Sequence, residues 1–432
     1  MLSKIKHILW GDLTKDEVKK FGMLSFTFLF IIGTYWLMRP LKDGLFMDLV
    51  GPSSLPYAKM LSFAFIVPLI LVYSKLVDLV EKQKLFYVLC SIYGVLFASV
   101  AFLLSQPAFS LNGPSTPSKR LLGWCVYLAI ESFGSLLVTL FWSFVASSTD
   151  TTSAKRGYAL IISGAQIGSI TGPYLATNAE HLGLSLLTAI VAGGILLVPL
   201  LIKTFITLYP SSAEKTVSTK PKTGPVEGLR LLLTKPYLLG VLGVATLYEI
   251  IGTVVDYQLK FLAKETYGSA EKVTQFLGYF GLTTNALALV FSLIGTTFFI
   301  NRYGLTFCLV MYPVSVAIVL VNIWALPGLW VVFVGMVAIK GFSYALNNPC
   351  KEIMYIPTSK DVKFKAKGWI DMFGSRSSKA AGASIGSMFP SMASLALYGP
   401  LLCMGIVGFW IMVALYVGRT NKKLVDSKTI IE

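Results

Sequence analysis

The sequence has few of the residues on which most soluble enzymes depend. Only 13% of its 432 residues are charged, and only two are histidine. Its five cysteines include no C-x-x-C pair and have no spacing typical of metal ligands. No Gly-Lys dipeptide occurs, which excludes the phosphate loop G-x4-G-K-[ST] of nucleotide-hydrolysing pumps. We therefore expect a protein that is not an enzyme and that holds no metal or other cofactor.

Apolar residues are present in excess. Hydrophobic residues make up 55% of the chain and the mean hydropathy is +0.71, which excludes an ordinary soluble domain. Runs of about 20 apolar residues, long enough to cross a bilayer, recur along the whole length. We predict an all-α integral membrane protein with twelve transmembrane helices. Their expected ranges are 22–48, 57–74, 85–104, 121–147, 157–178, 183–208, 237–262, 276–300, 303–326, 328–350, 365–389 and 396–418.

The positive charges indicate the orientation. The chain has 37 Lys and Arg against 21 Asp and Glu, a formal net charge of +16. Most Lys and Arg lie in alternate connections, beginning with the N-terminal segment, so both termini are expected in the cytoplasm. Lys59 and Lys260 are among the few on the opposite side. The net charge is thus explained by topology and by contact with anionic lipid, and we expect the bilayer, and no nucleic acid, as a partner.

One polar segment divides the chain. Residues 209–236 are rich in Pro, Ser, Thr and Lys, and six predicted helices lie on either side. We therefore predict an N-terminal six-helix bundle at 1–208, which begins with a short interfacial helix at 2–10. The segment 209–236 is the predicted cytoplasmic linker, and 237–432 is predicted to form a second six-helix bundle and a short cytoplasmic tail.

A weak internal repeat supports this division. SKLVDLVEK (74–82) follows the second predicted helix, and TTFFINRYG (296–304) spans the end of the eighth. Both resemble a degraded G-x-x-x-D-R-x-G turn. Such a 6+6 pseudo-repeat resembles the major facilitator architecture. Separately, Gly164, Gly168 and Gly172 recur every four residues, which predicts a helix face that a neighbouring helix can approach closely.

Charged residues interrupt the predicted spans. A charge at the centre of a transmembrane helix costs about 2.5–3.5 kcal/mol, so each one is a candidate functional residue. In order they are Arg39, Lys42 and Asp43 in RPLKDG, Glu131, Glu249, Asp256, Lys340, Lys351 and Glu352 in NNPCKE, and Arg376 and Lys379 in GSRSSK. The set contains both signs but has slightly more cations, as a carrier for a multiply charged anion requires. An interhelical ion pair is the alternative, and we favour it slightly for Glu249 and Lys340.

Several of these motifs have a familiar arrangement. They are KIKHILW near the start, RPLKDGLFMDLVG in the first helix, ESFGSLLVTLFWSFV and AKRGYAL around the fourth, VVDYQLKFLAKETY in the seventh, and NNPCKEIMYIP with KAKGWIDMFGSRSSKAAG in the tenth and eleventh. The sequence resembles the nucleotide transporter (ATP/ADP translocase) family of plastids and obligate intracellular bacteria. The resemblance runs nearly end to end, and the last block is the most specific.

The resemblance implies the function and the place of action. We expect a monomeric carrier that exchanges ATP for ADP, with phosphate, in the inner (plasma) membrane of an intracellular bacterium. A proton-coupled importer and an exchanger of other nucleotides are the alternatives within the family. The four charged residues that the family needs for transport fall on Lys42, Glu131, Asp256 and Lys379. At Asp256 the family usually has glutamate, so the reach of this side chain differs.

The chemistry of these residues agrees with phosphate binding. Lys and Arg bind phosphate in a low-dielectric site, which makes Lys42, Lys379, Arg376 and Lys351 the candidates for the phosphates, with Glu352 beside Lys351. We expect Glu131 and Asp256 to hold the cations while the site is empty, or to bond to ribose and base. Lys42, Glu131, Asp256 and Lys379 are expected to share one polar cavity between the two bundles. Pro40 and Pro349 are expected to interrupt the first and tenth helices just before Lys42 and Lys351.

Overall fold

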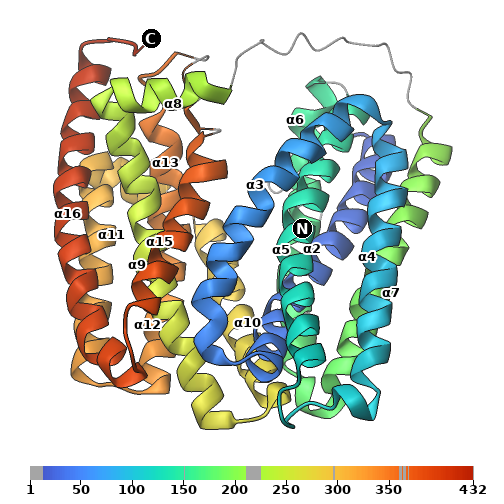
Figure 1. Ribbon diagram of the computed structural model, residues 1–432. Coiled ribbons are helices and arrows are strands. Elements are labelled where there is room, and N and C mark those ends of the chain that lie inside the picture. The colour runs from blue at the N-terminus through green and yellow to red at the C-terminus, as the bar shows by residue number, and fades with distance from the viewer. Residues whose placement is uncertain are drawn as a thin grey trace. The chain divides into compact units, whose positions relative to one another are not determined.

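The computed structural model is almost entirely helical in the residues that it describes, which are 13–149, 151–210, 225–294, 297–359, 362, 366–367 and 369–431. The long helices are α2 (Lys15–Leu49), α3 (Leu55–Leu79), α4 (Lys82–Leu104), α5 (Pro117–Ser148), α6 (Thr151–Ala176), α7 (Ala179–Leu208), α9 (Pro236–Tyr267), α10 (Ala270–Ile294), α11 (Thr297–Ala325) and α16 (Met392–Asp426). The shorter helices are α8 (Pro225–Thr234), α12 (Leu329–Phe342), α13 (Asn348–Met354) and α15 (Ser375–Ser387). Figure 1 draws these helices, coloured along the chain.

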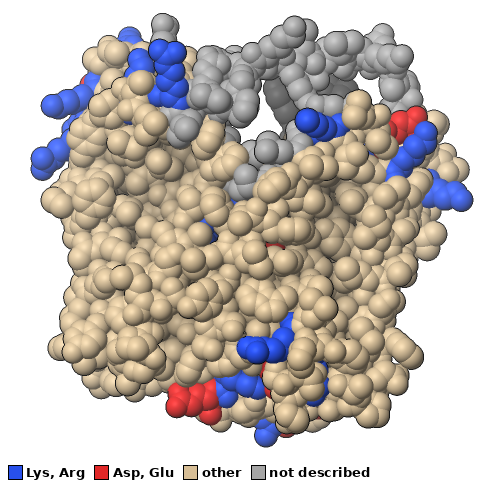
Figure 2. All heavy atoms as spheres, viewed as in Figure 1, with Lys and Arg blue, Asp and Glu red and all other residues tan. Residues whose placement is uncertain are grey.

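Nine of the described helices are long and apolar enough to cross a membrane, namely α2, α3, α4, α5, α7, α9, α10, α11 and α16. The α12 helix is apolar but short, and α15 carries Arg376 and Lys379 among small residues, so neither is in this set. The chain is therefore an all-helical membrane protein, whereas the count of twelve spans stays a prediction. On the face drawn in Figure 2, the charged side chains gather near the helix ends, as expected for a membrane protein.

The helices form two compact units. Unit 1 contains the described residues of Met1–Pro52, Ala64–Ser218 and Tyr267–Asn285, and unit 2 contains those of Ser53–Phe63, Thr219–Thr266 and Ala286–Glu432. The first turns of α3 thus belong to unit 2, and most of α10 belongs to unit 1. The predicted domain boundaries stay a prediction, because the helix at 2–10 and residues 211–224 of the linker lie outside the described residues.

Close packing of α2 against α6 organises unit 1. The predicted glycine face is confirmed: a Cβ added at Gly168 would lie 2.6 Å from the Leu29 carbonyl oxygen, and one at Gly172 would lie 2.3 Å from that of Gly33. Only glycine permits this approach of two backbones. The α2 helix begins at a capping box in which Thr14 and Glu17 each accept from the other's backbone N–H.

Local backbone geometry differs from the sequence expectation at one of two prolines. Pro40 lies inside α2, which continues without a break to Leu49, so the predicted interruption of the first helix is wrong. A membrane helix tolerates the missing N–H of proline when neighbouring groups satisfy the freed carbonyl. Pro349 does follow an irregularity, the π-helical segment η3 (Ser343–Asn347), which joins α12 to α13. A second π-helical segment, η4 (Ile370–Gly374), precedes α15.

The predicted turn around NRYG contains a bend in the structure. Gly304 has φ 80° and ψ 165° and separates two parts of α11, close to the expected end of the eighth helix and start of the ninth. A positive φ of this size favours glycine, because it strains residues that carry a Cβ.

Candidate functional site

Three groups of charged side chains lie within the described helices, and together they contain four of the seven predicted site residues as direct ion-pair partners. We call them the Lys42 cluster, the Glu249 cluster and the Asp256 cluster. The first lies in unit 1 and the other two in unit 2.

The Lys42 cluster joins α2 to α5. Lys42 Nζ donates to Glu131 Oε1 at 2.5 Å, and Asp43 Oδ1 lies 3.9 Å from the same ammonium. The ammonium also lies 4.5 Å from the ring centre of Tyr127, a cation–π contact. The Lys42 side chain is 9% exposed and that of Glu131 28%. The two residues that the resemblance singled out in this half of the sequence therefore contact each other, and Glu131 offsets the cost of burying Lys42.

Arg39 lies one turn before Lys42 on α2. Its guanidinium carbon lies 4.5 Å from the ring centre of Trp36 and 6.0 Å from that of Tyr35. These contacts place a second cation and two aromatic rings on the same helix as Lys42, at spacings that bring residues three and four apart close together.

The Glu249 cluster joins α9 to α15. Lys379 Nζ lies 3.8 Å from Glu249 Oε1, which also accepts hydrogen bonds from Tyr248 Oη at 2.6 Å and Ser375 Oγ at 3.4 Å. Glu249 interacts electrostatically with Lys340 and Lys351 as well. Three lysines therefore act on one carboxylate, which leaves an excess of positive charge among these four side chains.

The lysines of the Glu249 cluster differ in their exposure and in the side chains that they contact. The Lys379 side chain is 50% exposed, whereas Glu249 is buried. Lys351 Nζ lies 4.8 Å from the ring centre of Tyr248, so this ring contacts both Lys351 and, through its hydroxyl, Glu249. Both π-helical segments lie beside these lysines, η3 before Lys351 and η4 before Lys379. Such segments occur frequently at functional sites, because the extra residue re-aims the side chains that follow.

The Asp256 cluster joins α9 to the first turns of α3. Asp256 Oδ2 accepts from Lys59 Nζ and from Lys260 Nζ, both at 2.7 Å, and its side chain is only 17% exposed. Neither lysine was predicted as a site residue; both were expected only among the few cations on the non-cytoplasmic side. The i, i+4 spacing of Asp256 and Lys260 was visible in the sequence. The contact with Lys59 was not, because 197 residues separate it from Asp256.

Glu352 and Arg376 are the remaining predicted site residues. Glu352 follows Lys351 on α13, is exposed, and forms an ion pair with Lys367. Arg376 lies on α15 and is half-buried, three residues before Lys379. The structure thus groups Lys351 and Lys379 around Glu249, pairs Lys42 with Glu131, and gives Asp256 partners of its own.

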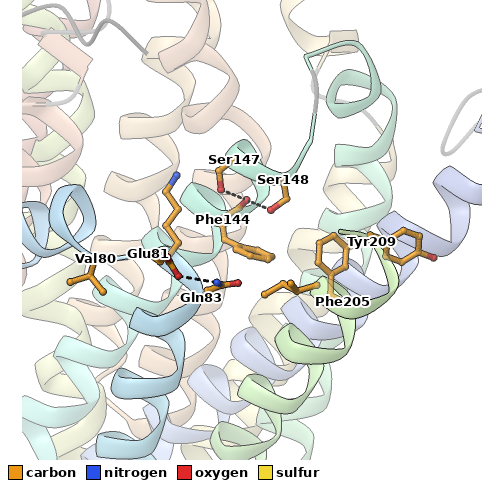
Figure 3. Close-up of a pocket in the computed structure, with 10 residues that line it drawn as sticks. Val80, Glu81, Gln83, Phe144, Ser147, Ser148, Phe205 and Tyr209 are labelled. Carbon is orange, nitrogen blue, oxygen red and sulfur yellow. Dashed lines mark hydrogen bonds between the residues drawn. The ribbon is translucent and has the colours of Figure 1, made fainter. Parts of the chain in front are cut away.

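A pocket of about 370 Å³ lies elsewhere in unit 1, between the α3–α4 connection and the C-terminal ends of α5 and α7 (Figure 3). Its lining includes Phe144, Phe205, Ser147 and Ser148, and none of the predicted site residues. At its edge, hydrogen bonds from Gln83 and Lys84 lower the pKa of the exposed Glu81 carboxyl. No group of three or more His, Cys, Asp or Glu among the described residues could hold a metal ion.

Several solved membrane transporters have a similar fold. A bacterial homologue of the iron transporter ferroportin, in an inward-facing state, matches with a TM-score of 0.67 at 12% identity over 94% of this chain and 100% of that structure. A peptide transporter matches with a TM-score of 0.63 at 12% identity over 93% and 95%. A nucleoside transporter matches with a TM-score of 0.56 at 14% identity over 93% and 98%. At these identities the likeness concerns the fold alone.

Sequence relatives are more specific. ADP,ATP carrier protein 1 of Rickettsia prowazekii is 27% identical over 90% of this chain and 89% of its own length. ADP,ATP carrier protein 2, chloroplastic, of Arabidopsis thaliana is 27% identical over 92% and 74%. ADP,ATP carrier protein 1 of Chlamydia pneumoniae is 25% identical over 95% and 93%. The sequence model of the TLC ATP/ADP transporter family matches residues 1–112 and 120–420, nearly the whole length, and the chain belongs to this family.

Proposed function

We propose that this protein is a membrane carrier that exchanges ATP for ADP, with phosphate, by alternating access. Membership of the TLC ATP/ADP transporter family and the names of the relatives support this proposal. The fold supports it as well, because the similar solved structures are transporters.

The observation that carries the proposal is the Glu249 cluster. Three lysines interact electrostatically with the one carboxylate of Glu249, and such a concentration of cations suits the binding of an anion. Lys379 is half exposed and can reach a phosphate without leaving the cluster, while Glu249 holds the lysines in place when no nucleotide is bound. Phosphate recognition by lysines rests on their charge, which is strengthened where water is partly excluded.

The other predicted site residues have related proposed roles. We assign the nucleotide phosphates to Lys379, Lys351, Arg376 and Lys42. In the empty carrier Glu131 neutralises Lys42, at 2.5 Å, and a bound phosphate would replace part of that interaction. Asp256 holds Lys59 and Lys260 in the same way. Glu352, which is paired with Lys367, is assigned to the rim of the site.

The proposed carrier has twelve spans in a 6+6 arrangement, works as a monomer, and has both termini in the cytoplasm of a bacterial cell, in its inner membrane. Within this scheme the nine longer apolar helices provide nine spans, and the other three are α6, α12 together with α13, and α15. The repeat is supported by α3 and α10, the second helix of each predicted half. The first turns of α3 group with unit 2, which holds most of the C-terminal half. The N-terminal part of α10 groups with unit 1, which holds most of the N-terminal half.

Uptake of labelled ATP into bacterial cells that express the protein tests the proposal. An exchanger requires ADP inside the cell and continues to work when an uncoupler removes the proton gradient. Uptake that ignores internal ADP and stops with the uncoupler would instead identify a proton-coupled importer. A matched strain that carries the double variant Lys42→Gln/Lys379→Gln provides the control for uptake by other routes.

A further inference from the structure

The Asp256 cluster has a property that the other two clusters lack: it connects parts of the chain that belong to different predicted halves. Lys59 lies in α3, on the N-terminal side of the linker, and Asp256 and Lys260 lie in α9, on its C-terminal side. The contact nevertheless lies within unit 2, because Ser53–Phe63 groups with α9 and not with the rest of α3. The α3 helix therefore passes from one unit into the other within its own length.

The corresponding segment of α10 is held in unit 1 by polar contacts. Asn112, in the α4–α5 connection, accepts from the Ala270 backbone N–H and donates to Glu271, both at 3.0 Å. Gln275 Nε2 donates to the Thr177 carbonyl at 2.7 Å. Thr274 packs so closely on α2 that a Cβ at Gly44 would lie 2.0 Å from its hydroxyl. The first turns of α3 follow the α2–α3 connection, and the corresponding part of α10 follows the α9–α10 connection. The distribution of Lys and Arg predicts that both connections lie on the non-cytoplasmic side.

Contacts of this kind can break and re-form. Ion pairs and hydrogen bonds exchange for water at small net cost, whereas a large apolar interface does not separate readily. The Asp256 carboxylate is an acceptor shared by Lys59 of α3 and Lys260 of α9, so its loss removes the ion pair between the two helices. The geometry of the cluster therefore suits a contact that closes in one state of a carrier and opens in another.

We propose that the Asp256 cluster closes the gate at the non-cytoplasmic ends of the helices, with Lys59 as a positioning residue that holds the first turns of α3 on α9. This inference rests on the proposed carrier function. In the cycle that it describes, the Lys59–Asp256 contact is made while the site faces the cytoplasm and must break before nucleotide can leave on the other side.

Chemical labelling of a cysteine at Ser62 tests the gate without any need for transport. Ser62 is buried, lies one turn after Lys59 on α3, and bonds to the Lys59 carbonyl. Exposed Cys125 is first replaced by Ser, since the other four cysteines are buried. Purified protein in detergent is then treated with N-ethylmaleimide, which reacts with thiols that water can reach. In this background, Ser62→Cys is expected to react slowly.

Lys59→Met and Asp256→Asn are each expected to raise the labelling rate about tenfold, because either change removes the ion pair between α3 and α9. The double variant Lys59→Asp/Asp256→Lys restores an ion pair between the helices and should return the rate to near that of the parent. Lys59→Arg keeps the charge and should label slowly. The matched control is Lys84→Met, which removes an exposed lysine in the first turn of α4, paired with Glu81 at 3.3 Å, and should change nothing.

Two results would overturn the gate. One is a labelling rate that neither Lys59→Met nor Asp256→Asn changes in protein that elutes and melts like the parent. The other is loss of ATP binding in Lys59→Met with unchanged labelling, which would make Lys59 a substrate contact. A protein that exchanges no nucleotide could still label slowly in the parent and fast in the two single variants. That result would support the gate and contradict the proposed exchange of ATP for ADP. The two proposals therefore fail separately.

Discussion

Replacing Lys379 by Gln should weaken nucleotide binding in proportion to the number of phosphates. Two unit charges 4 Å apart interact by about 1 kcal/mol in water and about 4 kcal/mol at an effective dielectric constant of 20. Lys379 is half exposed and lies 3.8 Å from Glu249, so an intermediate value of about 1–2 kcal/mol applies to a phosphate that binds there. Because 1.4 kcal/mol corresponds to a factor of ten in affinity, ATP should bind about tenfold more weakly.

The assay is competition by ATP, ADP and AMP against labelled ATP on purified protein. The loss should be largest for ATP, smaller for ADP and smallest for AMP, because the additional phosphates supply the charge that Lys379 attracts. Lys379→Arg keeps the charge with a different geometry and should recover only part of the affinity. Lys423→Gln removes an exposed lysine on α16 and serves as the control. An equal loss for all three nucleotides, or none, would refute the assignment of Lys379 to the phosphates.

Three further predictions concern stability and topology. Glu131→Gln should lower the free energy of unfolding by about 2 kcal/mol, measured by thermal unfolding, because buried Lys42 would lose its nearest carboxylate and keep only Asp43, at 3.9 Å. The loss lies below the 3–5 kcal/mol of a fully buried pair, since Glu131 is 28% exposed. An unchanged melting temperature would contradict it. Gly172→Ala should lower the free energy of unfolding by about 1–3 kcal/mol, because the added Cβ would clash with the Gly33 carbonyl. Gly193→Ala is the control and should leave the free energy of unfolding unchanged, since no atom lies within 4 Å of its added Cβ. Equal effects of the two changes would argue against the α2–α6 contact. Lys220→Cys in the predicted linker should react with impermeant thiol reagents only from the cytoplasmic side, and labelling from outside alone would reverse the predicted orientation.

Much of the fold class follows from local features of the sequence. Long apolar runs identify membrane helices wherever they occur, so the all-helical membrane class is confirmed by nine described helices. The glycines at 164, 168 and 172 predict a close helix contact because their four-residue spacing places them on one face, and the structure confirms that contact with α2. The family resemblance, read from motifs such as NNPCKEIMYIP, is confirmed over nearly the whole chain.

The site was harder to predict, because its contacts connect residues far apart in the sequence. The resemblance named Lys42 and Glu131, which do contact each other across 89 residues, but nothing in the sequence indicates which carboxylate Lys379 meets. The structure pairs it with Glu249, whereas Asp256 takes Lys59 and Lys260. Pro40 failed as a predictor of a helix break, since a membrane helix can continue through proline when its neighbours compensate for the lost hydrogen bond.

Exchange in proteoliposomes tests the proposed function most directly. Purified protein is reconstituted into vesicles that contain either ADP or no nucleotide, with no proton gradient, and labelled ATP is added outside. For an ATP/ADP exchanger we expect rapid entry of ATP into vesicles that contain ADP, exit of ADP in step with it, and almost no entry into empty vesicles. Equal entry into both kinds of vesicle, or entry only when a proton gradient is imposed, would contradict an ATP/ADP exchanger.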